Sequence, residues 1–176
     1  MKEKLRIRLA QISDYTMLAN LGRKAFYEAF GEFNDAADMQ AYLDLAFNPE
    51  AIKLQLQDPD ITYLVADLGN EPVGYAKLKR NSAPPELKDV NCIQLERIYT
   101  LKAFFGKHVG KALMIECIEI AKREKRKSIW LSVWQENKRA IDFYLLWKFK
   151  VIGFKQFVIG NEVNDDFVMA KNLDEL

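Results

Sequence analysis

The chain has few of the residues from which metal centres and disulfide frameworks are built. It contains one histidine, His108, and two cysteines, Cys92 and Cys117, and neither cysteine belongs to a Cys-x-x-Cys pair. A structural zinc site needs several Cys or His ligands at short spacings, so we expect no metal site. Two thiols outside any such motif are typical of buried side chains in a reducing compartment, which favours a cytoplasmic location.

The chain also lacks an excess of either charge. Its 26 Lys and Arg residues are balanced by 25 Asp and Glu residues, which gives a net charge of +1. We therefore expect neither a nucleic acid nor an anionic membrane as a partner. No apolar run approaches the roughly 18 residues of a membrane span. The stretch 1–14 has no apolar core of the kind that signal peptides carry.

What the sequence does contain is an alternation of strand-like and helix-like segments without a linker or repeat. With 49% hydrophobic residues over 176 positions, the composition predicts a single domain, 1–176, that buries a real core. Helical spacing of apolar residues predicts helices at 15–33, 37–47, 49–57, 109–125 and 137–149. Strand-like patterns lie at 4–10, 61–80, 92–100, 128–134, 150–160 and 165–173, with the second of these a hairpin that turns at Gly69 and Asn70.

This order predicts an α/β fold with a mixed sheet, in which the unit from 92 to 134 forms a parallel, right-handed βαβ crossover. The segment 128–134 is almost wholly apolar, as expected of a strand buried on both faces. We expect Ser13 or Asp14 to cap the first helix.

One segment, LERIYTLKAFFGKHVGKALM, is typical of a strand, a short loop and the start of a helix. A helix N-terminus presents unpaired backbone N–H groups and the positive end of the helix dipole, which together favour an anion. Gly106 and Gly110 would let the backbone approach a ligand, and Lys107 and Lys111 add positive charge. A plain tight turn with solvated lysines explains the same residues equally well.

Two nucleotide-binding motifs are excluded in this loop. A P-loop requires Gly-x-x-x-x-Gly-Lys followed by Ser or Thr, whereas Gly106 and Gly110 are one residue too close and Ala112 has no hydroxyl. The dinucleotide fingerprint Gly-x-Gly-x-x-Gly is absent as well.

Together with its surroundings, the loop resembles the GNAT superfamily of acyl-CoA-dependent N-acetyltransferases. In that family a strand is followed by (Arg/Gln)-x-x-Gly-x-(Gly/Ala) and a helix, and a later block has Asn followed by Ala-x-x-Phe-Tyr. This chain has FFGKHVGKAL and then ENKRAIDFY. Within the family, AYLDLAF, LERIYT, IWLSVWQEN and VMAKNL resemble the PaiA-type polyamine acetyltransferases. The resemblance implies a mostly antiparallel central sheet with one parallel, splayed pair, flanked by helices.

Three residues depart from the family pattern. Phe105 stands where the family has Arg or Gln, His108 where it has the first signature glycine, and Lys148 where a glycine precedes the final Phe. We expect Gly106 to supply the displaced backbone freedom, and histidine tolerates a positive φ better than most residues. Phe105 cannot donate to a pyrophosphate, so we expect weaker cofactor affinity. His108 either lies in solvent or lies near a phosphate and gains charge as the pH falls.

The resemblance implies acetyl-CoA as the cofactor and a set of residues that hold it. The pyrophosphate would lie on the loop and helix start, and the pantetheine arm would pair with the strand edge as an added strand. Asn137 would either bind the pantetheine arm, cap the helix, or do both. The full set is Ile98, Tyr99, Thr100, Phe105, Gly106, Lys107, His108, Val109, Gly110, Lys111, Asn137, Phe143 and Tyr144.

Acetyl transfer needs a base for the amine, because a free alkyl ammonium has a pKa near ~10.4. Glu96 is our candidate, since strand alternation would place it on the same face as Ile98. Its alternative role is as an ion-pair partner of Arg97, Lys79 or another base. The backbone N–H of Ile98 or Tyr99 would stabilise the oxyanion.

The leaving thiolate needs a proton, and the resemblance assigns its donation to Tyr144. Thiols have a pKa near ~8.5 and phenols near ~10, so the transfer carries little penalty. The alternative is that Tyr144 is a core aromatic residue on the stripe of Ala140, Ile141 and Trp147.

The expected activity is therefore transfer of acetyl to the primary amine of a small molecule, with spermidine and spermine as candidates. A non-catalytic acyl-CoA-binding regulator and a protein N-acetyltransferase are the alternatives. A polyamine would favour an acidic cleft, although runs of acids more often form a solvated face. Exposed strand edges would allow a homodimer, which nothing in the sequence requires. The acids in question are Glu28, Glu32, Asp35, Asp38 and Asp44.

Overall fold

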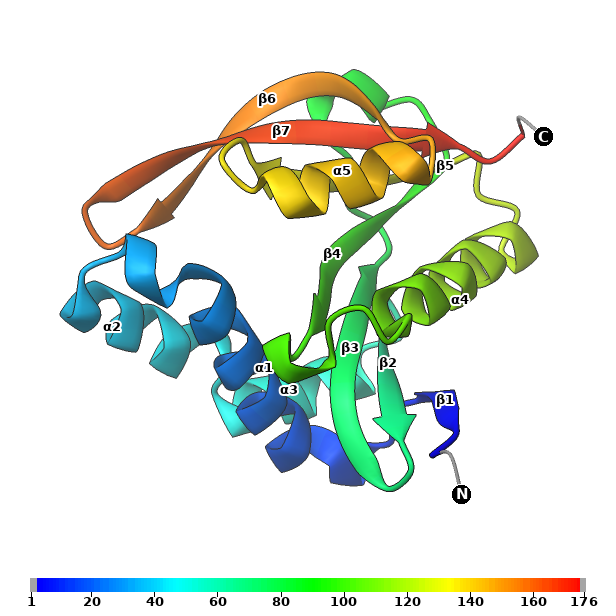
Figure 1. Ribbon diagram of the computed structural model, residues 1–176. Coiled ribbons are helices and arrows are strands. Elements are labelled where there is room, and N and C mark those ends of the chain that lie inside the picture. Colours follow the sequence, from blue (N-terminus) through cyan, green and yellow to red (C-terminus); the bar gives the residue numbers. More distant parts are fainter. Residues whose placement is uncertain (1–2, 175–176) are drawn as a thin grey trace.

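The computed structural model describes residues 3–174, which form one seven-stranded sheet with helices on both faces (Figure 1). The strand order is β1-β2-β3-β4-β5-β7-β6, and every neighbouring pair is antiparallel except β4 and β5. The predicted mixed, mostly antiparallel sheet with one parallel pair is confirmed. The strands are β1 Leu5–Leu9, β2 Ile61–Leu68, β3 Glu71–Lys79, β4 Cys92–Thr100, β5 Ser128–Trp134, β6 Lys150–Ile159 and β7 Glu162–Asn172.

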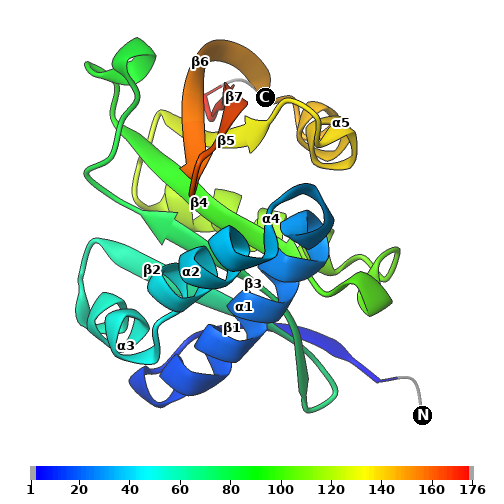
Figure 2. The same cartoon turned by 90° about the vertical axis from the view of Figure 1, so that its left-hand side faces the viewer.

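The helices cover the two faces of the sheet unequally. Helices α1 (Tyr15–Phe30), α2 (Ala36–Ala46) and α3 (Pro49–Gln57) pack on one face, in front of the sheet in Figure 2. Helices α4 (Val109–Arg123) and α5 (Lys138–Leu146) pack on the other. Each face therefore has its own apolar core. Within residues 3–174, no helix combines the length and the apolar character needed to cross a bilayer.

Helix ends differ from the predicted bounds for local reasons. α1 ends at Phe30 and continues only as a short 3-10 turn, Gly31–Phe33. α5 ends at Leu146 because Lys148 adopts a left-handed φ of 67°, and the Phe149 N–H closes the end on the Tyr144 carbonyl. Lys148 thus takes the conformation that a glycine would have there.

The predicted side-chain cap of α1 is not formed by the residue at its N-cap, Asp14. Asp14 precedes the helix, but its side chain makes no capping hydrogen bond to it. The Asp14 carboxylate instead accepts from the Gln11 N–H at 2.7 Å and from the Arg8 guanidinium at 2.8 Å. The ion pair fastens the start of α1 to β1.

The feature that positions the site is the early end of the β4–β5 pairing. The two parallel strands are in register only from Cys92 to Gln94 on β4, opposite Ser128 to Trp130 on β5. Beyond Gln94, β4 stays paired with β3 and β5 stays paired with β7. The sheet is therefore split into two halves along this line, as the predicted splayed pair requires.

Candidate active site

A cavity of about 1140 Å³ lies where β4 and β5 part. Its walls come from both halves of the sheet and from both faces, because α1 and α2 contribute on one side and the start of α4 and α5 on the other. In Figure 1, β4 runs between the group of α1 to α3 and helix α5. Every residue of the predicted site set lines this cavity, except Lys107.

The β4 edge beside the cavity has backbone groups that point away from β3. The Leu101 N–H donates to the Val73 carbonyl of β3 at 2.9 Å, and Tyr99 lies opposite Tyr75 in the same register. N–H directions alternate along a strand, so the Tyr99 N–H points to β3. The Ile98 and Thr100 N–H groups point to the gap. Of the two residues expected to donate to the oxyanion, Ile98 therefore presents its N–H to the gap and Tyr99 does not.

The loop before α4 adopts a conformation that exposes its N–H groups. Gly106 has φ 78° and His108 has φ 62°, so both are left-handed, as expected from the displaced glycine. His108 is exposed at the N-cap of α4, and the first backbone bond of the helix runs from Ala112 to the His108 carbonyl. The backbone N–H groups of 109–111 therefore have no helical acceptor and are available to an anion.

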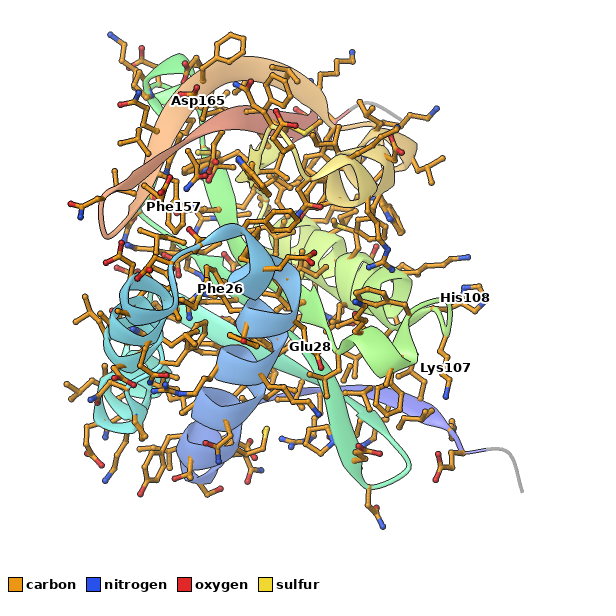
Figure 3. All side chains as sticks on the ribbon, turned by 60° about the vertical axis from the view of Figure 1, so that its left-hand side comes forward. Phe26, Glu28, Lys107, His108, Phe157 and Asp165 are labelled. Carbon is orange, nitrogen blue, oxygen red and sulfur yellow. The ribbon has the colours of Figure 1, made fainter. Side chains whose placement is uncertain are left out.

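Lys107 does not take the predicted place in the site. Its N–H donates to the Phe104 carbonyl at 3.3 Å, and its ammonium lies 5.0 Å from the centroid of the Phe104 ring. Lys107 and His108 both lie at the outer rim of the molecule (Figure 3). The turn before the loop is tied to α1, because the Lys102 N–H donates to the Glu28 carboxylate at 2.8 Å.

Phe105, which replaces the family's Arg or Gln, carries a cation on its ring. The Arg139 Cζ atom lies 3.3 Å from the Phe105 centroid, so the guanidinium of α5 stacks on the loop. Arg139 lines the cavity together with Phe105. Sequence reasoning did not single out Arg139, although it lies two positions after Asn137 in the second family block.

Helix α5 contributes three further residues. The Asn137 Oδ1 accepts from the Ala140 N–H at 3.2 Å and caps the helix, which leaves its amide N–H groups for the cavity. The Phe143 ring lies 3.7 Å from where a Cβ of Gly110 would stand. A side chain at position 110 would therefore fill the space between the start of α4 and α5. Tyr144 lies deeper, 8% exposed, and packs within the core beneath α4.

The environment of Tyr144 keeps its proton in place. Burial, with a smaller effect from the nearby Cys117 thiol, raises the pKa of the Tyr144 phenol well above its ordinary value. The phenol therefore stays protonated at neutral pH, which is the form that donates. A more weakly acidic phenol gives up its proton less readily, so the transfer from Tyr144 would carry a larger cost than ordinary pKa values predict.

Glu96 does not share a face with Ile98, contrary to the expected alternation. The β3–β4 register shifts here: Lys77 lies opposite Arg97, but Leu78 lies opposite Leu95, so Glu96 is the extra residue of a bulge. Ile98 packs into the core beneath α4, whereas Glu96 forms an ion pair with Lys77 on the side of α1 to α3. Glu96 still lines the cavity.

The ion pair decides the charge of Glu96. Burial alone would raise the pKa of the Glu96 carboxyl, yet the Lys77 ammonium and neighbouring cations outweigh it and leave the pKa below its ordinary value. The carboxylate is therefore ionised at neutral pH. The sequence left open whether Glu96 faces the reaction or a basic partner, and the structure gives it both a basic partner and a place on the cavity wall.

The acids of the early helices do not form an acidic cleft. Of the five, Glu28 alone lines the cavity, and it already accepts the Lys102 N–H. Asp35 caps α2, and Asp44 pairs with Arg23 at 2.8 Å. Within residues 3–174, no group of three or more His, Cys, Asp and Glu side chains is placed to hold a metal ion, and both cysteines are free and buried.

Comparison with known proteins agrees with this geometry. The model of the acetyltransferase (GNAT) family matches residues 23–149. An uncharacterized N-acetyltransferase in the pepI 3′ region of Lactobacillus delbrueckii subsp. lactis is 31% identical over 170 residues, which cover 95% of this chain and 98% of the relative.

Solved structures share the fold. The PaiA N-acetyltransferase of Thermoplasma acidophilum, in complex with coenzyme A, has a TM-score of 0.76 at 22% identity and covers 96% of this chain and 99% of its own. The structure named yncA from Salmonella typhimurium, solved with its cofactor acetyl-CoA, has a TM-score of 0.68 at 20% identity and covers 98% and 95%. The chain therefore belongs to the acetyltransferase (GNAT) family of enzymes.

Proposed function

We propose that the protein transfers an acetyl group from acetyl-CoA to the primary amine of a small molecule. The observation that carries this proposal is the end of the β4–β5 register at Gln94, beside a helix N-terminus with free N–H groups. An open strand edge binds an amide-rich arm, and a helix N-terminus binds a diphosphate. Coenzyme A joins these two chemistries in one molecule.

In this proposal the cofactor's pyrophosphate lies on the N–H groups of 109–111 and on those of Gly106 and His108. Arg139 supplies the cation that Phe105 cannot, and Phe105 holds the guanidinium by stacking. The departure at position 105 is thus compensated from another helix. The Ile98 and Thr100 edge pairs with the pantetheine arm, and Asn137 and Phe143 close the wall beside it.

The reaction then proceeds by direct attack. The neutral amine attacks the thioester carbonyl carbon, and the Ile98 N–H stabilises the oxyanion that forms. Collapse breaks the C–S bond, and the thiolate takes the proton of the Tyr144 phenol. Glu96, ionised through its pairing with Lys77, accepts the proton that the amine loses, directly or through water.

We place spermidine and spermine first among acceptors, because sequence blocks resemble PaiA-type enzymes and a PaiA N-acetyltransferase shares the fold. The free, buried thiols favour a cytoplasmic location. A homodimer would use the exposed edge strand β6, on which Phe154 is 69% exposed and Val158 is 53% exposed.

The proposed function is tested by calorimetry and by turnover. We expect acetyl-CoA to bind with a measurable heat and to be consumed when spermidine, spermine or a simple alkylamine is added. Release of CoA thiol would be followed with a thiol reagent, with a lysine peptide as the competing acceptor class. Binding without turnover on any amine would show a regulator instead of an enzyme, and absence of binding at millimolar acetyl-CoA would overturn the proposal.

Replacing Arg139 by Met should weaken CoA binding about tenfold. A hydrogen bond to a charged group contributes about 1.5 kcal/mol, which corresponds to roughly a factor of ten in affinity. Met retains an apolar stem over Phe105, so the loop should keep its conformation. The measurement is the dissociation constant of CoA compared with that of S-acetylpantetheine, which lacks the phosphates.

Only the phosphate-bearing ligand should lose affinity in the Arg139→Met protein. The matched control is Lys138→Met, because the Lys138 ammonium is exposed, pairs with Asp142 and lies outside the cavity. An equal loss of affinity for both ligands, or an equal loss in the control protein, would show that Arg139 does not bind the phosphates.

A further inference from the structure

Asp166 is a buried carboxylate on the cavity wall that the proposed reaction does not use. It is 6% exposed, it lines the cavity, and its Oδ1 has no hydrogen-bond partner among the described residues. An unpaired, desolvated carboxylate oxygen is unfavourable in the free protein. A donor that arrives with a ligand would relieve this cost.

Two charged residues lie near the Asp166 carboxylate. Lys155 on β6 is its partner in register, and Asp165 precedes it on β7; its neighbour on β5, Trp134, is uncharged. Burial raises the pKa of Asp166 to about 6, Lys155 works against this rise, and Asp165 adds to it. At pH 8 the group is therefore an anion.

Aromatic rings line the same cavity as this carboxylate, and Trp134 lies opposite Asp166 in the β5–β7 register. The Trp134 ring lies 6.3 Å from that of Phe30 on α1, and the Phe157 ring lies 5.7 Å from that of Tyr42 on α2. All four line the cavity. Figure 3 labels Phe157 on β6 and Phe26 on α1, and both of these residues line the cavity. We call the Asp166 carboxylate and the rings of Phe30, Tyr42, Trp134 and Phe157 the acceptor end.

A cavity wall that combines a buried carboxylate with aromatic rings matches the chemistry of an ammonium ion, which is drawn to both. An anionic ligand would be repelled by the carboxylate, and a neutral donor would bind it without the charge attraction that an ammonium adds. The acceptor end also lies on the side of α1 and α2, whereas Phe143, Tyr144 and the start of α4 belong to the other face.

We propose that Asp166 at the acceptor end binds a second, protonated nitrogen of the acceptor, and that this contact selects diamines and polyamines over monoamines. The reacting nitrogen must be neutral to attack, whereas a nitrogen held against a carboxylate remains an ammonium. The two states cannot belong to one nitrogen at the same moment. This inference rests on the proposed function, because it presumes that an amine is the acceptor.

The test compares matched acceptors that differ only in the second charge. Linear α,ω-diamines of three to eight carbons would each be assayed against the alkylamine in which a methyl group replaces the far ammonium. Initial rates at saturating acetyl-CoA and pH 8 would give kcat and KM for the wild type, Asp166→Asn and Asp165→Asn. Asp165 is the control because it is exposed, lies next to Asp166 and lines no part of the cavity.

We expect the wild type to show a KM for its best diamine at least tenfold below that for the matched monoamine. Asp166→Asn should raise the diamine KM about tenfold and change the monoamine KM less than twofold. Asp165→Asn should leave both unchanged. The wild-type preference for the diamine should shrink as the pH falls below about 6 and Asp166 gains a proton.

The inference is overturned if Asp166→Asn leaves the diamine KM unchanged, or if it lowers kcat for both amines by the same factor, because Asp166 would then serve the reacting nitrogen. Turnover of monoamines without any preference for diamines also overturns it while leaving the proposed function intact. No turnover with any amine, despite CoA binding, overturns the proposed function and this inference together. The urea midpoint of Asp166→Asn at pH 8 should equal or exceed that of the wild type, which separates a binding effect from misfolding.

Discussion

Replacing Tyr144 by Phe should lower kcat about 100-fold and leave the KM for acetyl-CoA nearly unchanged. General acid catalysis contributes on the order of 10²-fold or more, and the substitution removes the proton donor while keeping the ring in the core. In the proposed mechanism the phenol donates its proton only as the thiolate leaves, and the ring that lines the cavity is kept, so binding of acetyl-CoA should survive. Stopped-flow measurement of thiol release would separate the chemical step from product release.

Tyr75→Phe is the matched control for this experiment. Tyr75 is a fully buried phenol whose hydroxyl has no hydrogen-bond partner among the described residues, and it does not line the cavity. Removing its oxygen tests the general cost of deleting a buried hydroxyl. A loss of activity in the control equal to that of Tyr144→Phe, or full activity of Tyr144→Phe, would exclude Tyr144 as the general acid.

Replacing Glu96 by Gln should lower kcat/KM for the amine by roughly 10- to 100-fold, since the amine then loses its proton without a positioned base. The matched control is Glu119→Gln, an exposed glutamate of α4 outside the cavity. Glu96→Gln also leaves the Lys77 ammonium buried without its partner, which costs stability. The variant is therefore assayed only after its unfolding midpoint shows a folded protein.

Lys77→Met tests the same role while Glu96 stays in place. Lys77 holds the pKa of Glu96 below its ordinary value, so with a monoamine acceptor the acidic limb of kcat/KM that belongs to Glu96 should lie below the ordinary range of a glutamate. Without Lys77, fewer cations oppose the effect of burial on Glu96. The pKa of Glu96 therefore rises, and the acidic limb should move to higher pH. A limb at the same pH in both proteins would mean that the group titrating there is not Glu96.

The fold was predictable from the sequence because its signals are local. β-branched and aromatic runs, the Gly69–Asn70 turn and the amphipathic pattern of α4 each depend on neighbours along the chain, and the bounds of β4 and β5 match the expected ranges. The left-handed His108 followed from the same kind of reasoning, since one signature glycine had moved by two positions. The ends of α1 and α5 were less accessible because single residues decide them.

The contacts of the site were less predictable, because they join segments far apart in the chain. Strand alternation fails for Glu96 because a bulge in the β3–β4 pair adds one residue, and a bulge leaves no clear mark in one strand's sequence. The stacking of Arg139 on Phe105 joins a helix to a loop more than thirty positions earlier. Asp166 reads as one of two adjacent strand acids, and only burial separates it from Asp165.

The parting of β4 from β5 has a consequence for the order of events. Because the cavity is lined from both faces of the sheet, two ligands can enter it from opposite sides. The thioester would come in past α4 and α5, and the amine past α1 and α2, so neither has to depart before the other arrives. This arrangement predicts a ternary complex of enzyme, acetyl-CoA and amine. The product coenzyme A should compete with acetyl-CoA and should not block the binding of the amine.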